Sequence, residues 1–385
     1  MDDLGRYDAI VLGAGVVGAS SAWHLSRAGL RVALVDAEGP AAAASGASDG
    51  AVSVASKKPG PLARLATASL LYTRDLAAGG PLTGRYHPRP SYIFGSGGAE
   101  CGAIDDLIAK LDSLGSAVTL RRDGGPDRLP GTGAGIERLV ELGGEGHMPG
   151  YAAVAGYLED RRIDRIWPAR VQALHETGGG VVVDLGTARL SAPRVVAALG
   201  VSTRGLFPAM PVAPRAGQLF VTDRGPVGAL PGALTSAAYL LAKTTNPDVL
   251  PYPPVVIDPL TTGQYLVGST REAHGDPGRV DFATLQKLMR RAAQTWPALR
   301  ARRVIRAFAG VRAAVSDGLP IVGPAPGQSR VTLATGFEGD GICLSAMIGR
   351  EVARLAMGQP PTAGLAEDMA ALSPDRFARV RETAG

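Results

Sequence analysis

Three glycines near the start of the chain have the spacing of a site for a dinucleotide phosphate. Gly13, Gly15 and Gly18 form the pattern GxGxxG within GAGVVG, directly after the apolar run Ile10–Leu12 and before a run with helical periodicity. In such a turn the first glycine permits a tight bend, the second lets the backbone approach a pyrophosphate, and the third allows close packing of helix on strand. A pyrophosphate bound there would meet the N-terminus of a helix.

An acidic residue stands where the adenosine half of such a ligand would need it. A second apolar strand, Leu30–Val35, is followed by Asp36. A carboxylate about twenty residues beyond the glycines binds ribose hydroxyls and would repel a 2′-phosphate. The alternative is a glycine turn that is only structural. The complete unit of strand, turn, helix, strand and acidic residue favours a dinucleotide site.

Two further segments are rich in small residues that let a backbone lie against a ligand. In residues 41–50, AAAASGASDG, the hydroxyls of Ser45 and Ser48 and the amides of Gly46 and Gly50 are candidate donors to phosphate or ring oxygens; the alternative is a flexible loop. Near the end of the chain, an apolar strand at 331–335 is followed by GFEGDGI and a helical pattern with Asp340 at its N-cap position. A protein that binds only NAD needs no second glycine turn so far from the first. A flavin cofactor held along its whole length does, so this turn favours a flavin.

Composition excludes several classes of protein. The chain has 385 residues, 45% of them hydrophobic, so it can bury a large core and should form two domains. Its net charge of +5 comes from scattered arginines without the dense basic run of a nucleic-acid site. Cys101 and Cys343 have no metal-ligand spacing, so no zinc site is expected. No apolar run reaches the ~18 to 20 residues of a membrane span, and no signal peptide is evident. These features predict a soluble cytoplasmic protein.

The remaining pattern predicts three more helical segments and a second domain made mainly of sheet. Helical spacing occurs at 57–76, with Pro59–Pro61 at its start, at 104–114 and at 281–295. Short strands with a GGG turn at 178–180 predict a meander over 171–190, and the apolar run 195–199 predicts a strand that returns to a central sheet. Extended segments at 218–222, 255–258 and 265–269 predict a sheet for the second domain.

Together these blocks resemble the amine and D-amino-acid oxidase family of FAD oxidoreductases, which includes glycine oxidase, sarcosine oxidase and the opine and hydroxyproline dehydrogenase flavoproteins. The resemblance rests on GAGVVG with Asp36, ASGASDG at 44–50, VGSTRE at 267–272, GVRAAVSDGLPIVGP at 310–324 and TGFEGDGI at 335–342. It implies an α/β fold, α+β overall, in which a Rossmann-like FAD-binding domain (1–75, 150–205 and 306–360) is interleaved with an antiparallel-sheet substrate domain (76–149 and 206–305). Residues 361–385 would form a C-terminal tail.

The resemblance also implies which residues contact FAD. Pyrophosphate, ribose, adenine and ring contacts are assigned by motif to Gly13, Ala14, Gly15, Val16, Val17, Gly18, Asp36, Ser45, Gly46, Ser48, Gly50, Val171, Gly336, Gly339, Asp340, Gly341 and Ile342. In related sarcosine oxidases a cysteine tethers the flavin. Gly310 stands near that place here, and VSD replaces the usual TPD, so non-covalent FAD is expected.

For the substrate, Arg312 matches the arginine that pairs with the substrate carboxylate in glycine oxidase-like enzymes. A guanidinium offers a fork to a planar carboxylate and stays charged when partly desolvated. Ala313 stands where proline is common, and an ordinary ion pair is the alternative role. Tyr252, Tyr265 and Arg271 are weaker candidates, because a tyrosine in a sheet is more often core than contact. His147, beside glycines, is expected in a loop.

The predicted activity is oxidation of the C–N bond of a small amino acid, secondary amino acid or opine to an imine, by hydride transfer to flavin N5. No catalytic base is predicted. The alternatives are an FAD-dependent 2-hydroxy acid oxidase or dehydrogenase, since a carboxylate clamp would serve both, and a flavin-carrying subunit of a larger electron-transfer complex. The electron acceptor is expected to be oxygen or a partner protein, and a homo- or hetero-oligomer is possible.

Overall fold

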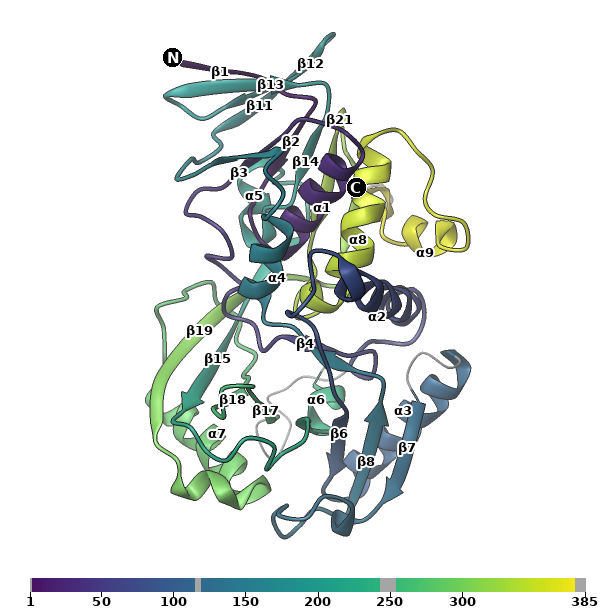
Figure 1. Ribbon diagram of the computed structural model, residues 1–385, viewed down its shortest axis with the longest axis vertical. Helices are drawn as coiled ribbons and strands as arrows, with labels where there is room; N and C mark the ends of the chain where they lie inside the picture. Colours follow the sequence, from purple (N-terminus) through teal and green to yellow (C-terminus); the bar gives the residue numbers. More distant parts are fainter. Residues whose placement is uncertain (1, 115–118, 243–253, 378–385) are drawn as a thin grey trace, which may run out of the picture.

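A computed structural model describes residues 2–114, 119–242 and 254–377 of the chain. Two large sheets dominate it, one in the upper and one in the lower half of Figure 1. The upper sheet has six strands in the order β10, β3, β2, β14, β21 and β20, which span Ile163–Ile166, Val32–Val35, Ala9–Leu12, Val195–Ala197, Gln328–Thr335 and Ile321–Ala325. All neighbours pair in parallel except β20 with β21. The predicted α/β fold is confirmed.

Alternation along the central strands explains why this sheet is covered on both faces. In β2, Ala9 and Val11 belong to one buried cluster, while Ile10 and Leu12 belong to another. The first cluster includes apolar residues of the helices α1 (Val16–Arg27), α4 (Gly150–Tyr157) and α8 (Gly341–Ala356). Successive strand residues point to opposite faces, so a strand buried on both faces is apolar throughout.

The opposite face is covered by the predicted meander. Its strands β11 (Ala173–Thr177), β12 (Gly180–Asp184) and β13 (Ala188–Ala192) are antiparallel neighbours, and β1 (Asp2–Arg6) adds to β13 in parallel. Val181, Val183 and Leu190 from this small sheet pack in the same cluster as Ile10 and Leu12. The two strands of the βαβ unit, β2 and β3, therefore lie between a helical layer and a sheet layer.

The lower sheet has eight strands in the order β19, β15, β18, β17, β16, β6, β8 and β7, which span Val304–Val315, Val212–Thr222, Tyr265–Gly268, Val256–Pro259, Ala233–Ser236, Ser91–Gly95, Arg138–Gly143 and Thr119–Gly124. It is antiparallel except between β16 and β6. A third sheet is short and consists of β4 (Ala51–Val52), β9 (Gly146–His147) and β5 (His87–Pro88). The sheet predicted for the second half of the chain is present.

The remaining helices are α2, α3, α5, α6, α7 and α9, which span Pro61–Gly79, Gly98–Leu114, Thr203–Leu206, Ala238–Leu241, Phe282–Thr295 and Ala366–Ala370. Helix α2 begins at Pro61, within the proline segment expected at its start, because a proline at the first helical position needs no backbone hydrogen bond. Helix α7 begins where predicted, since Asp281 accepts a capping bond from the Thr284 N–H at 2.6 Å. The domain boundaries expected from the sequence stay a prediction.

Candidate functional site

The glycine turn joins strand β2 to helix α1 at the carboxyl edge of the six-stranded sheet. Gly13 has a φ of +101°, and a Cβ there would lie 2.3 Å from the Ala198 carbonyl oxygen. A Cβ on Gly18 would lie 1.9 Å from the Gly13 carbonyl oxygen. Both positions accept only glycine, one for the bend and one for the close approach of α1 to the turn.

The middle glycine faces open space. At Gly15, the N-cap of α1, the one neighbouring atom that a Cβ would meet within 4 Å is the Ser45 hydroxyl oxygen, at 3.2 Å. That hydroxyl accepts a hydrogen bond from the Val16 N–H at 3.0 Å. The first N–H groups of a helix have no partner within the helix, so this end of α1 is suited to bind an anion.

Asp36 follows β3 and fixes the geometry of two loops. Its Oδ2 accepts a hydrogen bond from the Ala14 N–H at 2.7 Å, and its Oδ1 accepts from the N–H groups of Glu38 and Gly39, each at 2.8 Å. The carboxylate therefore ties the glycine turn to the loop after β3. Each oxygen has two lone pairs, so acceptor capacity remains for a ligand hydroxyl.

The loop at 41–50 divides into residues that line a cavity and residues that do not. Ser45 and Ser48 line it, and the Ser48 hydroxyl donates to the Ser45 carbonyl at 2.9 Å. The Gly46 amide already donates to the Ala43 carbonyl at 3.1 Å, and a Cβ on Gly50 would lie 2.7 Å from His147 Nε2. The Gly46 amide is therefore already engaged within the loop, Gly50 has no room for a side chain, and the donor role expected of Gly50 stays a prediction.

The second glycine turn leads from β21 into α8, as predicted. Gly336 has a φ of +74°, and Gly341 and Ile342 begin the helix. Asp340 stands at the N-cap, but its side chain makes no capping hydrogen bond. The N-cap position is as predicted, but the carboxylate forms a buried ion pair with Lys57 Nζ at 3.0 Å in place of a capping bond. The first N–H groups of α8 are left for a ligand.

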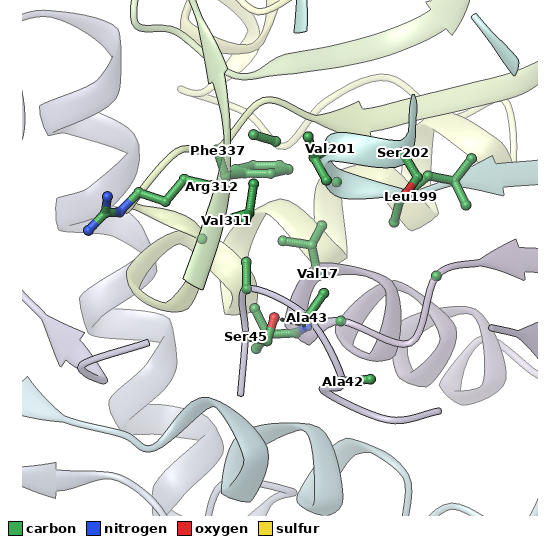
Figure 2. A pocket seen from close by; sticks show the side chains of 18 of the residues that line it. Val17, Ala42, Ala43, Ser45, Leu199, Val201, Ser202, Val311, Arg312 and Phe337 are labelled. Carbon is green, nitrogen blue, oxygen red and sulfur yellow. Dashed lines mark hydrogen bonds between the residues drawn. The ribbon is translucent and has the colours of Figure 1, made fainter. Parts of the chain in front are cut away.

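One cavity of about 510 Å³ runs along all these segments. Its lining includes Gly13, Gly15, Val16, Val17, Asp36, Ser45, Ser48, Val171, Arg312, Gly336, Gly339, Gly341 and Ile342. Figure 2 shows Val17, Ala43 and Ser45 at one part of the cavity and Val201, Phe337 and Arg312 at another, with the Arg312 side chain directed away from Ser45. The volume lies within the ~300 to 1,000 Å³ usual for ligand pockets.

Arg312 lies on β19, half buried, at one end of the cavity. Its Nη1 donates to the carbonyls of Ala216 and Thr270 at 3.3 and 3.2 Å, and its Nη2 donates to the Ser269 hydroxyl at 2.6 Å. A guanidinium has five N–H groups. The Nε–H lies outside these three bonds, and Nη2 has a second N–H, so the guanidinium keeps donors for a carboxylate.

Sequence reasoning missed Tyr239, which the structure brings to the same place. A Cβ on Gly339 would lie 3.7 Å from the Tyr239 hydroxyl oxygen and 3.9 Å from Arg312 Nε. Tyr239 also lines the cavity. Helix α6 carries it from a part of the chain without a recognisable motif, so only three-dimensional proximity identifies it. A tyrosine hydroxyl and a guanidinium edge thus flank one glycine of the α8 turn.

The other predicted substrate and loop residues lie elsewhere. Tyr252 lies outside the described residues. Tyr265 is 3% exposed in the core of the lower sheet, which was the alternative weighed for it. Arg271 follows strand β18 and forms an ion pair with Glu338, and this contact supports the GFEGDGI turn. His147 is buried in the short strand β9, so the expectation of a loop was wrong; burial lowers its pKa to about 4.

Comparison with known proteins identifies the family. The sequence model of the protein family described as DAO, FAD dependent oxidoreductase, matches residues 8–355 of this chain. The chain belongs to this family of FAD-dependent oxidoreductases. It is 24% identical over 368 residues to a glycine oxidase of Bacillus licheniformis, covering 92% of this chain and 94% of that protein. It resembles the crystal structure of glycine oxidase from Geobacillus kaustophilus with a TM-score of 0.83, at 22% identity and with 96% and 98% of the two chains covered.

A further relative is longer than this chain. The tRNA 5-methylaminomethyl-2-thiouridine biosynthesis bifunctional protein MnmC of Maricaulis maris (strain MCS10) is 29% identical over 374 residues, which are 96% of this chain and 55% of that protein. The chain therefore spans about half the length of that relative. Among the described residues, no helix is long and apolar enough to cross a membrane, and no group of three or more His, Cys, Asp or Glu side chains is placed to hold a metal ion.

The cavity fits the FAD that this family uses. Two helix N-termini, those of α1 and α8, face it, as an extended cofactor with a pyrophosphate and a flavin ring requires. Asp36, Val171 and Gln172 lie at the end suited to adenosine, and Gly15 leaves open space for phosphate oxygens. Gly310, near the place of the flavin-bonded cysteine in sarcosine oxidases, lies against Ala47, so no thiol is offered there.

Proposed function

We propose that this chain oxidises the C–N bond of a small amino acid, secondary amino acid or opine to an imine, with the hydride passing to N5 of FAD. The observation that carries the proposal is the Arg312 edge at Gly339. Nε lies near this glycine with its N–H outside the three bonds that hold the guanidinium, close to the Tyr239 hydroxyl and beside the turn that opens α8, where a carboxylate would bind. A hydrogen bond to a charged group typically contributes ~1.5 to 3 kcal/mol.

Three backbone and hydroxyl acceptors fix the guanidinium before substrate arrives. Ala216, Thr270 and Ser269 hold Nη1 and Nη2 from the neighbouring strand β15 and from the end of β18. A cation held in this way loses little side-chain freedom on binding, which favours a defined carboxylate position. With the carboxylate fixed, the α-carbon is restricted to the space near Gly339 and Tyr239.

The electron balance of the reaction needs few protein groups. The neutral amine nitrogen lends its lone pair to form the C=N bond as the Cα–H bond breaks, and the hydride leaves with both electrons. FAD supplies the two-electron acceptor when bound. Water then attacks the iminium carbon to release an oxo acid and an amine, or the imine cyclises. The proposal assigns no general base, because the amine enters already deprotonated.

The names of relatives support an amine substrate that carries a carboxylate. Glycine oxidase is the activity printed for the relative from Bacillus licheniformis at 24% identity. The family match shows an FAD-dependent oxidoreductase, and the choice of substrate rests on the Arg312 geometry. Because nothing in the cavity selects one acceptor, the proposal leaves reoxidation to oxygen or to a partner protein.

Anaerobic mixing tests the substrate class. The purified holoenzyme is combined with glycine, sarcosine, proline, iminodiacetate and an opine, and in parallel with glycolate and lactate, while the absorbance of oxidised flavin is followed. We expect bleaching by at least one amino acid and by neither hydroxy acid. Bleaching by a hydroxy acid alone would favour the 2-hydroxy acid oxidase. Bleaching by no compound, with dithionite still reducing the flavin, would favour a subunit that only carries electrons.

A further inference from the structure

A second, smaller cavity of about 50 Å³ adjoins the cofactor cavity. The two share Asp49, Tyr239 and Gly339, and the smaller one is lined also by Lys57 and Asp340. Gly339 and Gly341, on either side of Asp340, line the cofactor cavity. The Asp340 side chain therefore lies directly behind the wall that the α8 turn presents to FAD.

Lys57 and Asp340 form an ion pair that is almost completely removed from water. Their side chains are 2% and 10% exposed, and Lys57 Nζ lies 3.0 Å from Asp340 Oδ1. Lys57 Nζ also donates to the Ser56 hydroxyl at 2.9 Å. A buried charge is costly unless it is paired, so each partner makes the other tolerable in this position.

The segment that carries Lys57 is itself held from two sides. The buried Glu145 carboxylate accepts hydrogen bonds from the N–H groups of Val54 and Ala55 at 2.9 and 3.0 Å. From helix α3, Lys110 Nζ donates to the carbonyl of Lys57 at 2.9 Å. These contacts keep the Lys57 ammonium in place against the start of α8.

The attraction between the two groups keeps the Lys57 ammonium charged. Burial alone would lower the pKa of Lys57, but the neighbouring Asp340 carboxylate raises it above its usual value. Burial raises the pKa of the Cys343 thiol to about 11, so this neighbour stays uncharged near neutrality. The pair is then a cation and an anion with no net charge.

An unpaired carboxylate at Asp340 would oppose the function of the helix end that it occupies. The N-terminus of α8 carries the positive end of the helix dipole, which stabilises negative charge on a ligand placed before it. Reduced flavin gains such a charge. We propose that Lys57 is a positioning residue that neutralises Asp340, so that the N-terminus of α8 favours reduction of FAD. The inference rests on FAD in the larger cavity and not on the amino acid substrate, so it can fail separately from the proposed function.

The two-electron midpoint potential of bound FAD tests this inference without turnover. It is measured by equilibration with a reference dye for the wild type, Lys57→Gln, Asp340→Asn and the double variant. We expect Lys57→Gln to disfavour reduction about tenfold, a shift of about 30 mV to lower potential for a two-electron couple. Asp340→Asn should shift the potential upward, because it leaves a cation near the ring. The double variant, a neutral isosteric pair, should return close to the wild type.

Lys58→Gln is the matched control, since Lys58 is the next residue and lines neither cavity. It should leave the potential unchanged. Shifts of the same sign in both single variants, or none in either between pH 6 and 9, would overturn the inference. If one single variant loses FAD, the inference is tested by the sign of the shift in midpoint potential of the other single variant. Loss of FAD from both single variants with normal FAD content in the double variant would assign the pair a structural role alone and so would also overturn it.

Discussion

The N–H of Ala14 donates a hydrogen bond of 2.7 Å to Oδ2 of Asp36, and this contact joins the glycine turn after β2 to the end of β3. Because Oδ1 of the same carboxylate accepts from Glu38 and Gly39, one side chain sets the shape of both loops at the adenosine end of the cavity. The carboxylate is thus in place before any ribose hydroxyl reaches it.

Asp36→Ala should weaken FAD binding by about ten- to hundred-fold. The substitution removes the carboxylate acceptor for the ribose hydroxyls, a hydrogen bond to a charged group contributes ~1.5 to 3 kcal/mol, and each 1.4 kcal/mol is tenfold in affinity. The measurement is the Kd for FAD of the apoprotein, from quenching of flavin fluorescence. Asp8→Ala is the control, because Asp8 also accepts a backbone bond, from Arg31 at 2.8 Å, on the exposed surface. Equal affinity of the Asp36 variant and the wild type would remove Asp36 from the cofactor site.

Gly15→Val should give a folded protein that does not retain FAD. A Cβ at Gly15 meets only the Ser45 hydroxyl oxygen within 4 Å, so the fold should tolerate a side chain there, which would fill the space that phosphate oxygens need against the backbone. Flavin content after purification and the far-ultraviolet circular dichroism spectrum are compared. Gly102→Val is the control, since Gly102 has open space around it in α3. A yellow Gly15→Val protein with stoichiometric FAD would show that phosphate lies elsewhere.

Local pattern predicted the elements at the cofactor end because each one carries its own signals. The burial of alternate residues of Ala9–Leu12 in two different clusters and the bend at Gly13 are both determined within a few residues. Tyr239 and Lys57 could not be found in that way. Each gains its meaning from a residue distant in the sequence, Gly339 and Asp340 respectively, and no short motif encodes such a contact.

The same reason explains why the Asp340 side chain does not cap α8, although the residue stands at the predicted N-cap. An aspartate before a helical pattern predicts a side-chain cap, since that is the local option with the most hydrogen bonds. A buried lysine offers a stronger partner, and only the packing of residues 53–57 against α8 brings it within 3.0 Å. Tertiary contact therefore overrode a local preference that was otherwise well founded.

FAD should leave the protein completely on acid precipitation. Neither cysteine is placed at the tether position, where Gly310 stands, and Cys343 is buried with its pKa raised to about 11. A thiol that stays protonated is a poor nucleophile toward a flavin carbon. The supernatant is analysed by chromatography against FAD and FMN standards. Yellow colour that stays with the precipitated protein would contradict non-covalent binding.

Stability should fall on acidification from pH 6.5 toward pH 4. Burial lowers the pKa of His24 and of His147 to about 4, below the usual 6.5, so the unfolded chain binds more protons within this window. Each histidine then destabilises the fold by up to ~1.4 kcal/mol per pH unit as the pH falls. Urea midpoints at several pH values measure the slope. His24→Gln should flatten it, while His175→Gln, on the exposed part of β11, should not; an unchanged slope in the first variant would refute the assignment.

Replacement of Arg312 tests the carboxylate contact on which the proposed function rests. Arg312→Leu should keep FAD bound but reduce the second-order rate of flavin reduction by about ten- to hundred-fold or more, because a bond to a charged group contributes ~1.5 to 3 kcal/mol. Arg312→Lys should restore the charge and only part of the rate, since an ammonium cannot make the forked contact of the Nε and Nη2 edge. Arg306→Leu, an exposed arginine on the same strand, should behave as the wild type.

The measurement that isolates the carboxylate is anaerobic reduction of each variant by the best amino acid and by its decarboxylated amine. If Arg312 holds the carboxylate, its removal slows reduction by the amino acid and leaves reduction by the amine nearly unchanged, because the amine never used the contact. Ser269, Ala216 and Thr270 would still be present to orient a lysine at this position, so partial rescue has a structural basis. Equal losses toward both compounds, or no loss toward either, would place Arg312 outside the substrate site and return it to the role of an ordinary strand-to-strand contact.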